Sequence, residues 1–243
     1  SIMSAVCHFP SLEDAVMTAQ QVIQYGVPIA RIEMLNADQM GISINYSKLK
    51  DIEAVPTLFF EFHGSESSNK ENIEIVEELS KDNKGSSFKW AKDLEDRNKL
   101  WQARWDVYYS VKALNDNGRV YSTDVCVPIS KITECVKFAE EKAKEFGVRA
   151  PMVGHMGDGN FHVVLPYDPA KKEMYKQLRA FNSSLIRKAL ELEGTITGEH
   201  GVGLHKKEYL LEQHPDSIPV MKSIKRTLDP NNIMNPGKIF DLN

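Results

Sequence analysis

Two glycine-rich segments of this 243-residue chain gather side chains that could bind a metal ion and activate a bound molecule. Half of the fourteen glycines lie between Gly154 and Gly203, and four of the seven histidines lie between His155 and His205. Imidazole and carboxylate groups are common ligands of zinc and similar divalent ions. A set of two histidines and one carboxylate would also leave positions open for a substrate.

The first segment, GHMGDGNFH, predicts a β-hairpin, because an Asp-Gly pair between alternating apolar residues is a strong turn signal. With Asp158 and Gly159 at the two turn positions, His155 pairs directly with His162. Cross-strand partners share a face, with β-carbons about 5 Å apart. Both imidazoles could then hold one divalent ion. A hydrogen-bonded histidine pair without metal is the alternative.

The second segment, GTITGEHGVG, supplies a carboxylate at Glu199 and an imidazole at His200. Its glycines allow the backbone to approach a ligand closely. Adjacent residues of an extended strand point to opposite sides, so both groups can face one ion only where the chain turns. A glycine-rich loop with an exposed acid is the alternative.

Arg104 lies on a long helix expected over residues 93–114, with Trp101 three residues before it and Tyr108 four residues after it. This spacing predicts an aromatic helix face around the guanidinium. A buried guanidinium is costly unless it is paired, and a substrate carboxylate would be a bidentate partner. Stacking on Trp101 combined with a structural salt bridge is the alternative.

The apolar periodicity predicts an α+β fold. We expect strands at 1–10, 30–34, 58–62, 120–127 and a strand pair within 151–166, and helices at 12–25, 69–79, 93–114, 128–146, 169–193 and 217–228. Residues 82–87 are predicted as a loop and 115–118 as a turn.

The order strand-helix-strand-strand-helix occurs twice, and FPSLEDAV and VPISKITECV occupy matching places in the two copies. This repetition predicts two ferredoxin-like halves that form an antiparallel sheet, with helices mainly on one face. The end of the chain is predicted as a rigid turn followed by a short strand.

Composition limits the classes of function. The chain is 42% hydrophobic and 26% charged, which is typical of a soluble globular protein. Its net charge of -4 does not indicate a nucleic-acid surface, and no apolar run approaches the ~20 residues of a membrane span. Cys7, Cys126 and Cys135 lack metal or redox spacing and are predicted to be reduced thiols. The opening strand has no polar leader, so we expect a fragment or a processed chain.

Together the segments GHMGDGNFH, GTITGEHGVG and LDPNNIMNPGKIF resemble motifs of FAD-linked oxidases of the vanillyl-alcohol-oxidase and p-cresol-methylhydroxylase fold. ARWDVYYS and VYSTDVCVP resemble the D-lactate dehydrogenase branch, especially its mitochondrial type. The resemblance covers nearly the whole chain, residues 1–243, as the C-terminal substrate and metal domain. It implies that an FAD-binding domain precedes this region and that the tail, 229–243, returns towards it, with Asn235 beside the flavin.

The resemblance also implies a reaction and a set of roles. A small D-2-hydroxy acid such as D-lactate would be oxidised to a 2-oxo acid, with hydride passing to FAD. His155, His162 and Glu199 would hold zinc or manganese, and Arg104 would bind the substrate carboxylate. His200 would be the general base, with His162 as its rival.

Several alternatives stay open at this point. Within the family, the chain could belong to a glycolate oxidase subunit or a D-2-hydroxyglutarate dehydrogenase. Val164 and Ser122 stand where the latter's relatives carry a polar residue and a lysine, which disfavours a second substrate carboxylate. Outside the family, the alternatives are a metal-dependent hydrolase and a non-catalytic, metal-stabilised domain. The expected location is mitochondrial for a eukaryotic source and cytoplasmic otherwise, and the sequence does not identify the electron acceptor.

Overall fold

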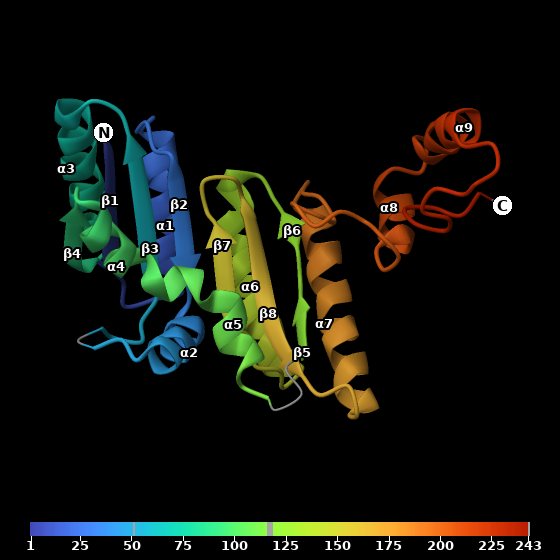
Figure 1. Ribbon diagram of the computed structural model, residues 1–243, viewed down its shortest axis with the longest axis horizontal. Coiled ribbons are helices and arrows are strands. Elements are labelled where there is room, and N and C mark those ends of the chain that lie inside the picture. The colour runs from blue at the N-terminus through green and yellow to red at the C-terminus, as the bar shows by residue number, and fades with distance from the viewer. Residues whose placement is uncertain (51, 116–118, 243) are drawn as a thin grey trace.

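The structure is a computed structural model that describes residues 1–50, 52–115 and 119–242 (Figure 1). Its strands are β1 (Ile2–His8), β2 (Arg31–Leu35), β3 (Thr57–His63), β4 (Ser86–Ala91), β5 (Arg119–Ser122), β6 (Val125–Cys126), β7 (Met152–His155) and β8 (Asn160–Tyr167). Its helices are α1 (Leu12–Gln24), α2 (Ala37–Ser47), α3 (Glu66–Asp82), α4 (Leu94–Trp105), α5 (Val107–Lys112), the 3-10 helix η1 (Ile129–Lys131), α6 (Ile132–Glu145), α7 (Lys172–Glu191), α8 (Lys207–Gln213) and α9 (Ile218–Leu228).

The strands form one sheet in the order β4-β1-β3-β2-β7-β8-β5, and β6 also pairs with β8. The order β4-β1-β3-β2, with α1 and α3 as crossovers, is that of a ferredoxin-like unit. The second half has the same strand order, and β5 and β6 together take the place of its first strand. In the place of its fourth strand there is a single β-bridge between Thr195 and Cys126. The two halves join through the antiparallel pair β2–β7, which confirms the prediction of two ferredoxin-like halves in an antiparallel sheet.

The alternation of side chains along the strands gives the sheet two apolar faces. The crossover helices α1, α3, α6 and α7 pack on one face, against side chains such as Ala5, Phe60 and Phe161. A smaller core on the other face joins Val6 and Phe59 to α2, α4 and α5. The four helices of the repeats therefore share one face as predicted, while the opposite face is covered only in part by shorter helices (Figure 1).

The helix boundaries follow local signals where those are strong. The Ser11 side chain accepts a hydrogen bond from the backbone nitrogen of Asp14 and begins α1, and Gly26 after its end has a φ of 70°. The start expected at Pro169 is wrong, because Asp168 accepts from Ala170 in a separate turn and α7 begins at Lys172.

Other expectations need correction. The single helix over 93–114 is two helices, α4 and α5, separated at Asp106, whose carboxylate accepts hydrogen bonds from Ser47 and Gln102. The strand over 120–127 is broken between β5 and β6, and β4 begins inside the expected loop at 82–87. Helices α2 and α8 were not predicted. In the tail, residues 229–242 form turns and no strand, and most of the turn at 115–118 lies outside the described residues.

No helix within the described ranges is both long and apolar enough to cross a bilayer.

All three cysteines are free thiols, as predicted. Burial raises the pKa of Cys7 to about 11 and that of Cys135 to about 12, so at pH 8 their thiolate fractions fall more than about 100-fold below that of a free cysteine. We expect iodoacetamide to modify the partly exposed Cys126 first, with the other two reacting only after unfolding in guanidinium. Peptide mass spectrometry over time tests this order, and equal rates for all three thiols in the folded protein would contradict it.

Candidate active site

The β7–β8 hairpin brings His155 and His162 to one face of the sheet. The predicted register is wrong: His155 pairs with Asn160 and Val153 with His162, so the loop has four residues, 156–159. The loop closes with a hydrogen bond of 3.0 Å from the Asp158 nitrogen to the His155 carbonyl. The slip moves His162 along the strand without moving it to the other face, because side chains alternate with a period of two. The two ring centroids lie 5.6 Å apart.

Buried Met156 accounts for the longer loop. Its side chain is fully buried and its terminal methyl lies so close to Gly154 that a β-carbon there would come within 2.0 Å. Gly159 follows with a φ of 77°, a conformation that glycine adopts readily. Met156 therefore packs in the apolar core and does not pair with Phe161 as the Asp-Gly signal predicts, so the hairpin loop is longer.

Glu199 meets both imidazoles. Its Oε1 lies 2.9 Å from Nε2 of His162, 3.4 Å from Nε2 of His155 and 3.5 Å from Nε2 of His200. The donor atoms of His155, His162 and Glu199 all lie within 4.8 Å of one another. Because residues 194–203 form bends and turns around the Thr195 bridge, the adjacent Glu199 and His200 approach the same point.

The two imidazoles present their Nε2 atoms to Glu199. Nδ1 of His162 donates to the carbonyl of Thr123 over 3.0 Å, and Nδ1 of His155 donates to Oε1 of Glu33 over 2.7 Å. Burial lowers the pKa of His162, so its neutral form, with a lone pair on Nε2, is favoured. Oε1 of Glu199 lies 2.9 Å from this buried Nε2, but within the described residues the two atoms form no hydrogen bond. A lone pair that faces a carboxylate oxygen calls for a cation between them, so these residues fit a divalent metal ion.

Glu33 was missed as a site residue in the sequence. It lies on β2 directly opposite His155, its side chain is only 7% exposed, and its Oε2 accepts from Nε of Arg104 over 2.9 Å. Burial alone raises the pKa of this carboxyl, but the hydrogen bond of His155 and the charge of Arg104 outweigh burial and hold the pKa below its usual value. The sequence signal that could have indicated Glu33 is the position of a carboxylate inside the strand expected at 30–34.

Asp124, in the gap between β5 and β6, orients the Glu199 loop and was also missed. Its buried carboxylate accepts from the backbone nitrogens of Glu199 (3.3 Å) and His200 (3.0 Å) and from Nζ of Lys206 (3.3 Å). Further bonds come from Thr197 and Asn160. Burial opposes ionisation, yet these donors hold the pKa of Asp124 far below its usual value. Only the break in the strand pattern could have indicated it.

Arg104 lies near the end of α4 and is joined to His155 through Glu33. The predicted aromatic face is wrong, since the chain breaks at Asp106 and Tyr108 is 52% exposed. Trp101 instead lies under Arg31, whose guanidinium carbon is 4.9 Å from the ring centre. The structural salt bridge considered for Arg104 is present, but it uses only Nε. In the part of the chain described, the terminal nitrogens of Arg104 donate no hydrogen bond.

Asn235 is not brought to the cluster by any contact among the described residues. Its side-chain oxygen accepts from Nζ of Lys238 over 3.0 Å. The tail is fixed to the Glu199 loop by a bond from the Ile239 nitrogen to the Gly203 carbonyl and lies beside α8 and α9 (Figure 1).

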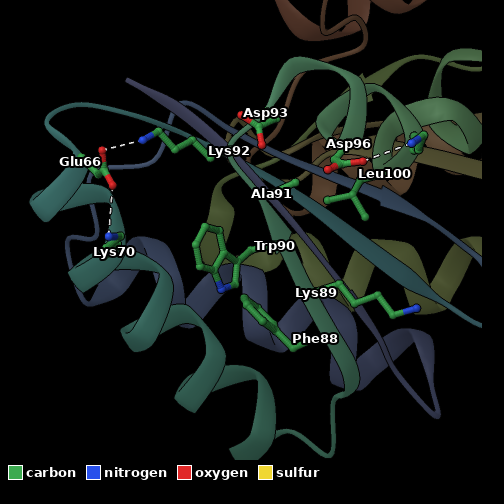
Figure 2. Close-up of a pocket in the computed structure, with 11 residues that line it drawn as sticks. Glu66, Lys70, Phe88, Lys89, Trp90, Ala91, Lys92, Asp93, Asp96 and Leu100 are labelled. Carbon is green, nitrogen blue, oxygen red and sulfur yellow. Dashed lines mark hydrogen bonds and ion pairs between the residues drawn. The ribbon is translucent and has the colours of Figure 1, made fainter.

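A hollow of about 780 Å³ lies away from the histidine cluster, beside the edge strand β4 (Figure 2). Trp90 projects into it, and its charged rim is largely paired: Glu66 binds both Lys70 and Lys92. These rim charges already bind one another, whereas Nε2 of His162 is without a hydrogen-bond partner within the described residues, so the histidine cluster is the better candidate for chemistry.

Comparison with known proteins shows the family. Residues 1–239 match the family described as FAD linked oxidases, C-terminal domain, and the chain belongs to that family. Among curated relatives, the probable D-lactate dehydrogenase, mitochondrial, of Danio rerio is 44% identical over 243 residues, which are 100% of this chain and 49% of the relative. The D-lactate dehydrogenase [cytochrome], mitochondrial, of Arabidopsis thaliana is 36% identical over 97% of this chain and 42% of its own. The chain thus spans about half the length of the curated relatives it matches.

The solved structures agree on the fold. The structure of p-cresol methylhydroxylase with substrate bound aligns with a TM-score of 0.73 at 13% identity, over 100% of this chain and 53% of that chain. The 4-ethylphenol oxidase from Gulosibacter chungangensis aligns with a TM-score of 0.70 at 17% identity, over 99% of this chain and 54% of the oxidase chain.

Proposed function

We propose that this chain is the substrate- and metal-binding part of a flavin-dependent dehydrogenase that oxidises a D-2-hydroxy acid, such as D-lactate, to a 2-oxo acid. The observation that carries the proposal is the convergence of His155, His162 and Glu199 within 4.8 Å. The carboxylate of Glu33 joins Arg104 to His155 in this cluster. The names of the relatives support the substrate class. Family membership favours this function over a hydrolase or a non-catalytic domain.

His155, His162 and Glu199 are the proposed ligands of one zinc or manganese ion. A divalent ion there would lower the pKa of a substrate hydroxyl, as it does for water. The fixed Nδ1 bonds of both histidines support this role, because metal-binding imidazoles usually donate their other nitrogen to a carboxylate or a carbonyl.

Arg104 is the proposed anchor of the substrate carboxylate, through its terminal nitrogens. His200 is the proposed general base. Its side chain is 59% exposed at the edge of the cluster and its ring centre lies 5.0 Å from that of His162, so it can receive the hydroxyl proton and pass it to solvent. His162 is a weaker candidate for the base, because one ring nitrogen is bonded to Thr123 and the other faces Glu199.

The chemistry that FAD supplies when bound is acceptance of the hydride from C2 of the substrate. We propose that a further part of the protein binds most of the flavin and that the tail, with Asn235, packs towards that part. Leu228, Ile233 and Met234 are largely exposed, and an exposed apolar patch of this kind suits contact with another domain.

The substrate proposed is small or apolar beyond its carboxylate. Ser122 and Val164 are cross-strand partners on β5 and β8 and offer no cation for a second carboxylate, which disfavours 2-hydroxyglutarate. Glycolate stays a candidate, since the glycolate oxidase subunit GlcD of Bacillus subtilis is a relative at 30% identity. By the names of relatives we also propose a mitochondrial location and a cytochrome as electron acceptor.

Replacing Arg104 with alanine tests the substrate assignment in the flavin-loaded, full-length protein. We expect kcat/KM for D-lactate to fall about 100-fold, because a buried charge pair is lost, while the methyl ester of D-lactate loses much less. Arg31→Ala is the matched control, since Arg31 also pairs with a glutamate on the same sheet. Equal losses for acid and ester would contradict the role of Arg104, and absence of any D-2-hydroxy acid oxidation by the wild type would contradict the proposed function.

A further inference from the structure

We infer that Glu33 is a positioning residue that holds the substrate-binding arginine and a metal-binding histidine in one fixed arrangement. The inference rests on the proposed function and adds a residue to it. Glu33 touches neither substrate nor metal; it acts through Arg104 and His155.

The geometry divides the carboxylate between two partners. Oε1 accepts from Nδ1 of His155 over 2.7 Å, and Oε2 accepts from Nε of Arg104 over 2.9 Å. The β2–β7 register places Glu33 opposite His155, so the first bond is set by strand pairing. A carboxylate that is 7% exposed in the middle of a sheet is costly unless such partners compensate it.

Each hydrogen bond to Glu33 uses one nitrogen of its partner and leaves the other nitrogens free to bind metal or substrate. Donation from Nδ1 fixes the tautomer of His155 and leaves the Nε2 lone pair facing Glu199. Donation from Nε holds the guanidinium of Arg104 by one edge and leaves both terminal nitrogens for a substrate carboxylate. One side chain therefore aligns the two groups that would bind neighbouring atoms of a 2-hydroxy acid.

Only a carboxylate can perform both tasks at this position. Both partners are donors, and a carboxylate accepts on each oxygen. Glutamine has nearly the same shape but a single acceptor oxygen, so its amide group would face one of the two donors. Glu33→Gln should therefore release either His155 or Arg104 with little change in packing.

The chain contains a matched control on the next strand. Glu61 of β3 also joins an arginine to a histidine, with Arg31 at 2.8 Å and His63 at 2.8 Å, and its side chain is 11% exposed. This second Arg–Glu–His group has the same residue types, although Arg31 bonds through a terminal nitrogen and His63 through Nε2. It does not contact the Glu199 cluster in the described structure. Glu61→Gln therefore reports the general effect of removing such a carboxylate.

The experiment measures Zn²⁺ affinity by competition with a chromophoric chelator, and D-lactate kinetics at saturating Zn²⁺, in the full-length, flavin-loaded protein. For Glu33→Gln we expect Zn²⁺ to bind about 10–100-fold more weakly, as is typical when a partner of a metal-binding histidine is lost. We also expect KM to rise more than kcat falls, because Arg104 loses its orientation. Glu61→Gln should stay within about threefold of the wild type in both measurements.

A folded Glu33→Gln protein whose Zn²⁺ affinity and KM both stay within threefold of the wild type would overturn the inference while leaving the proposed function intact. If Glu33→Gln does not fold, Glu33→Asp, which keeps the charge but shortens the reach, is measured with the same expectation and the same overturning result. Wild-type protein that binds no Zn²⁺ and oxidises no D-lactate would instead refute the proposed function, and the inference with it.

Discussion

Replacing His155 with alanine is expected to remove the metal and nearly all turnover from the full-length protein. The substitution deletes one of the three donor groups that lie within 4.8 Å and frees Glu33 from one of its two partners. Loss of a direct ligand should weaken metal binding by more than the ~10–100-fold that follows loss of a ligand's partner. Elemental analysis of dialysed protein and initial rates with D-lactate give the two readouts.

His63→Ala serves as the control for this experiment, because His63 bonds to Glu61 as His155 bonds to Glu33. That variant should retain its metal and its rate. If exhaustive chelation of the wild type removes the metal and leaves the rate unchanged, the ion has no part in the reaction.

Replacing Asp124 with alanine is expected to give the largest loss of stability. The change would leave the partly buried Lys206 ammonium without its carboxylate and the backbone nitrogens of Glu199 and His200 without an acceptor. Breaking a buried ion pair from one side typically costs about 3–5 kcal/mol. For a chain of this size we expect a Tm about 10 °C lower, measured by thermal unfolding followed by circular dichroism.

Asp38→Ala is the comparison for stability, because Asp38 forms a bidentate pair with Arg149 on the surface. Exposed pairs of this kind contribute up to about 1 kcal/mol. An Asp124→Ala protein that unfolds within 1 kcal/mol of the wild type would show that the loop around Glu199 does not depend on this carboxylate.

Helices and strands with a regular apolar pattern could be predicted from the sequence. Features that depend on contacts with residues far away in the chain could not. The alternation in β2 and β3 and the apolar stripe of α1 follow from burial of one face, so the two ferredoxin-like halves could be predicted. The break at Asp106 could not, because it depends on Ser47 of a helix that carried no clear signal.

The candidate site shows the same division. His155 and His162 could be placed on one face from the hairpin pattern alone, even though their register was wrong, because an even change in loop length preserves the face. The roles of Glu33 and Asp124 could not be predicted, since each acts on residues more than seventy positions away. An acid inside a strand and an acid at a break in a strand are local signals, but neither reveals those partners.

The β2–β7 pairing has a consequence for how this chemistry could arise. In the described structure the strand pairing between the two ferredoxin-like units consists of three residue pairs, and one of them is Glu33 with His155. The first unit alone holds a carboxylate with no imidazole opposite it, and the second holds imidazoles with no arginine beside them. The catalytic capacity that we propose is therefore a property of the two units together, because neither unit by itself contains both Glu33 and His155.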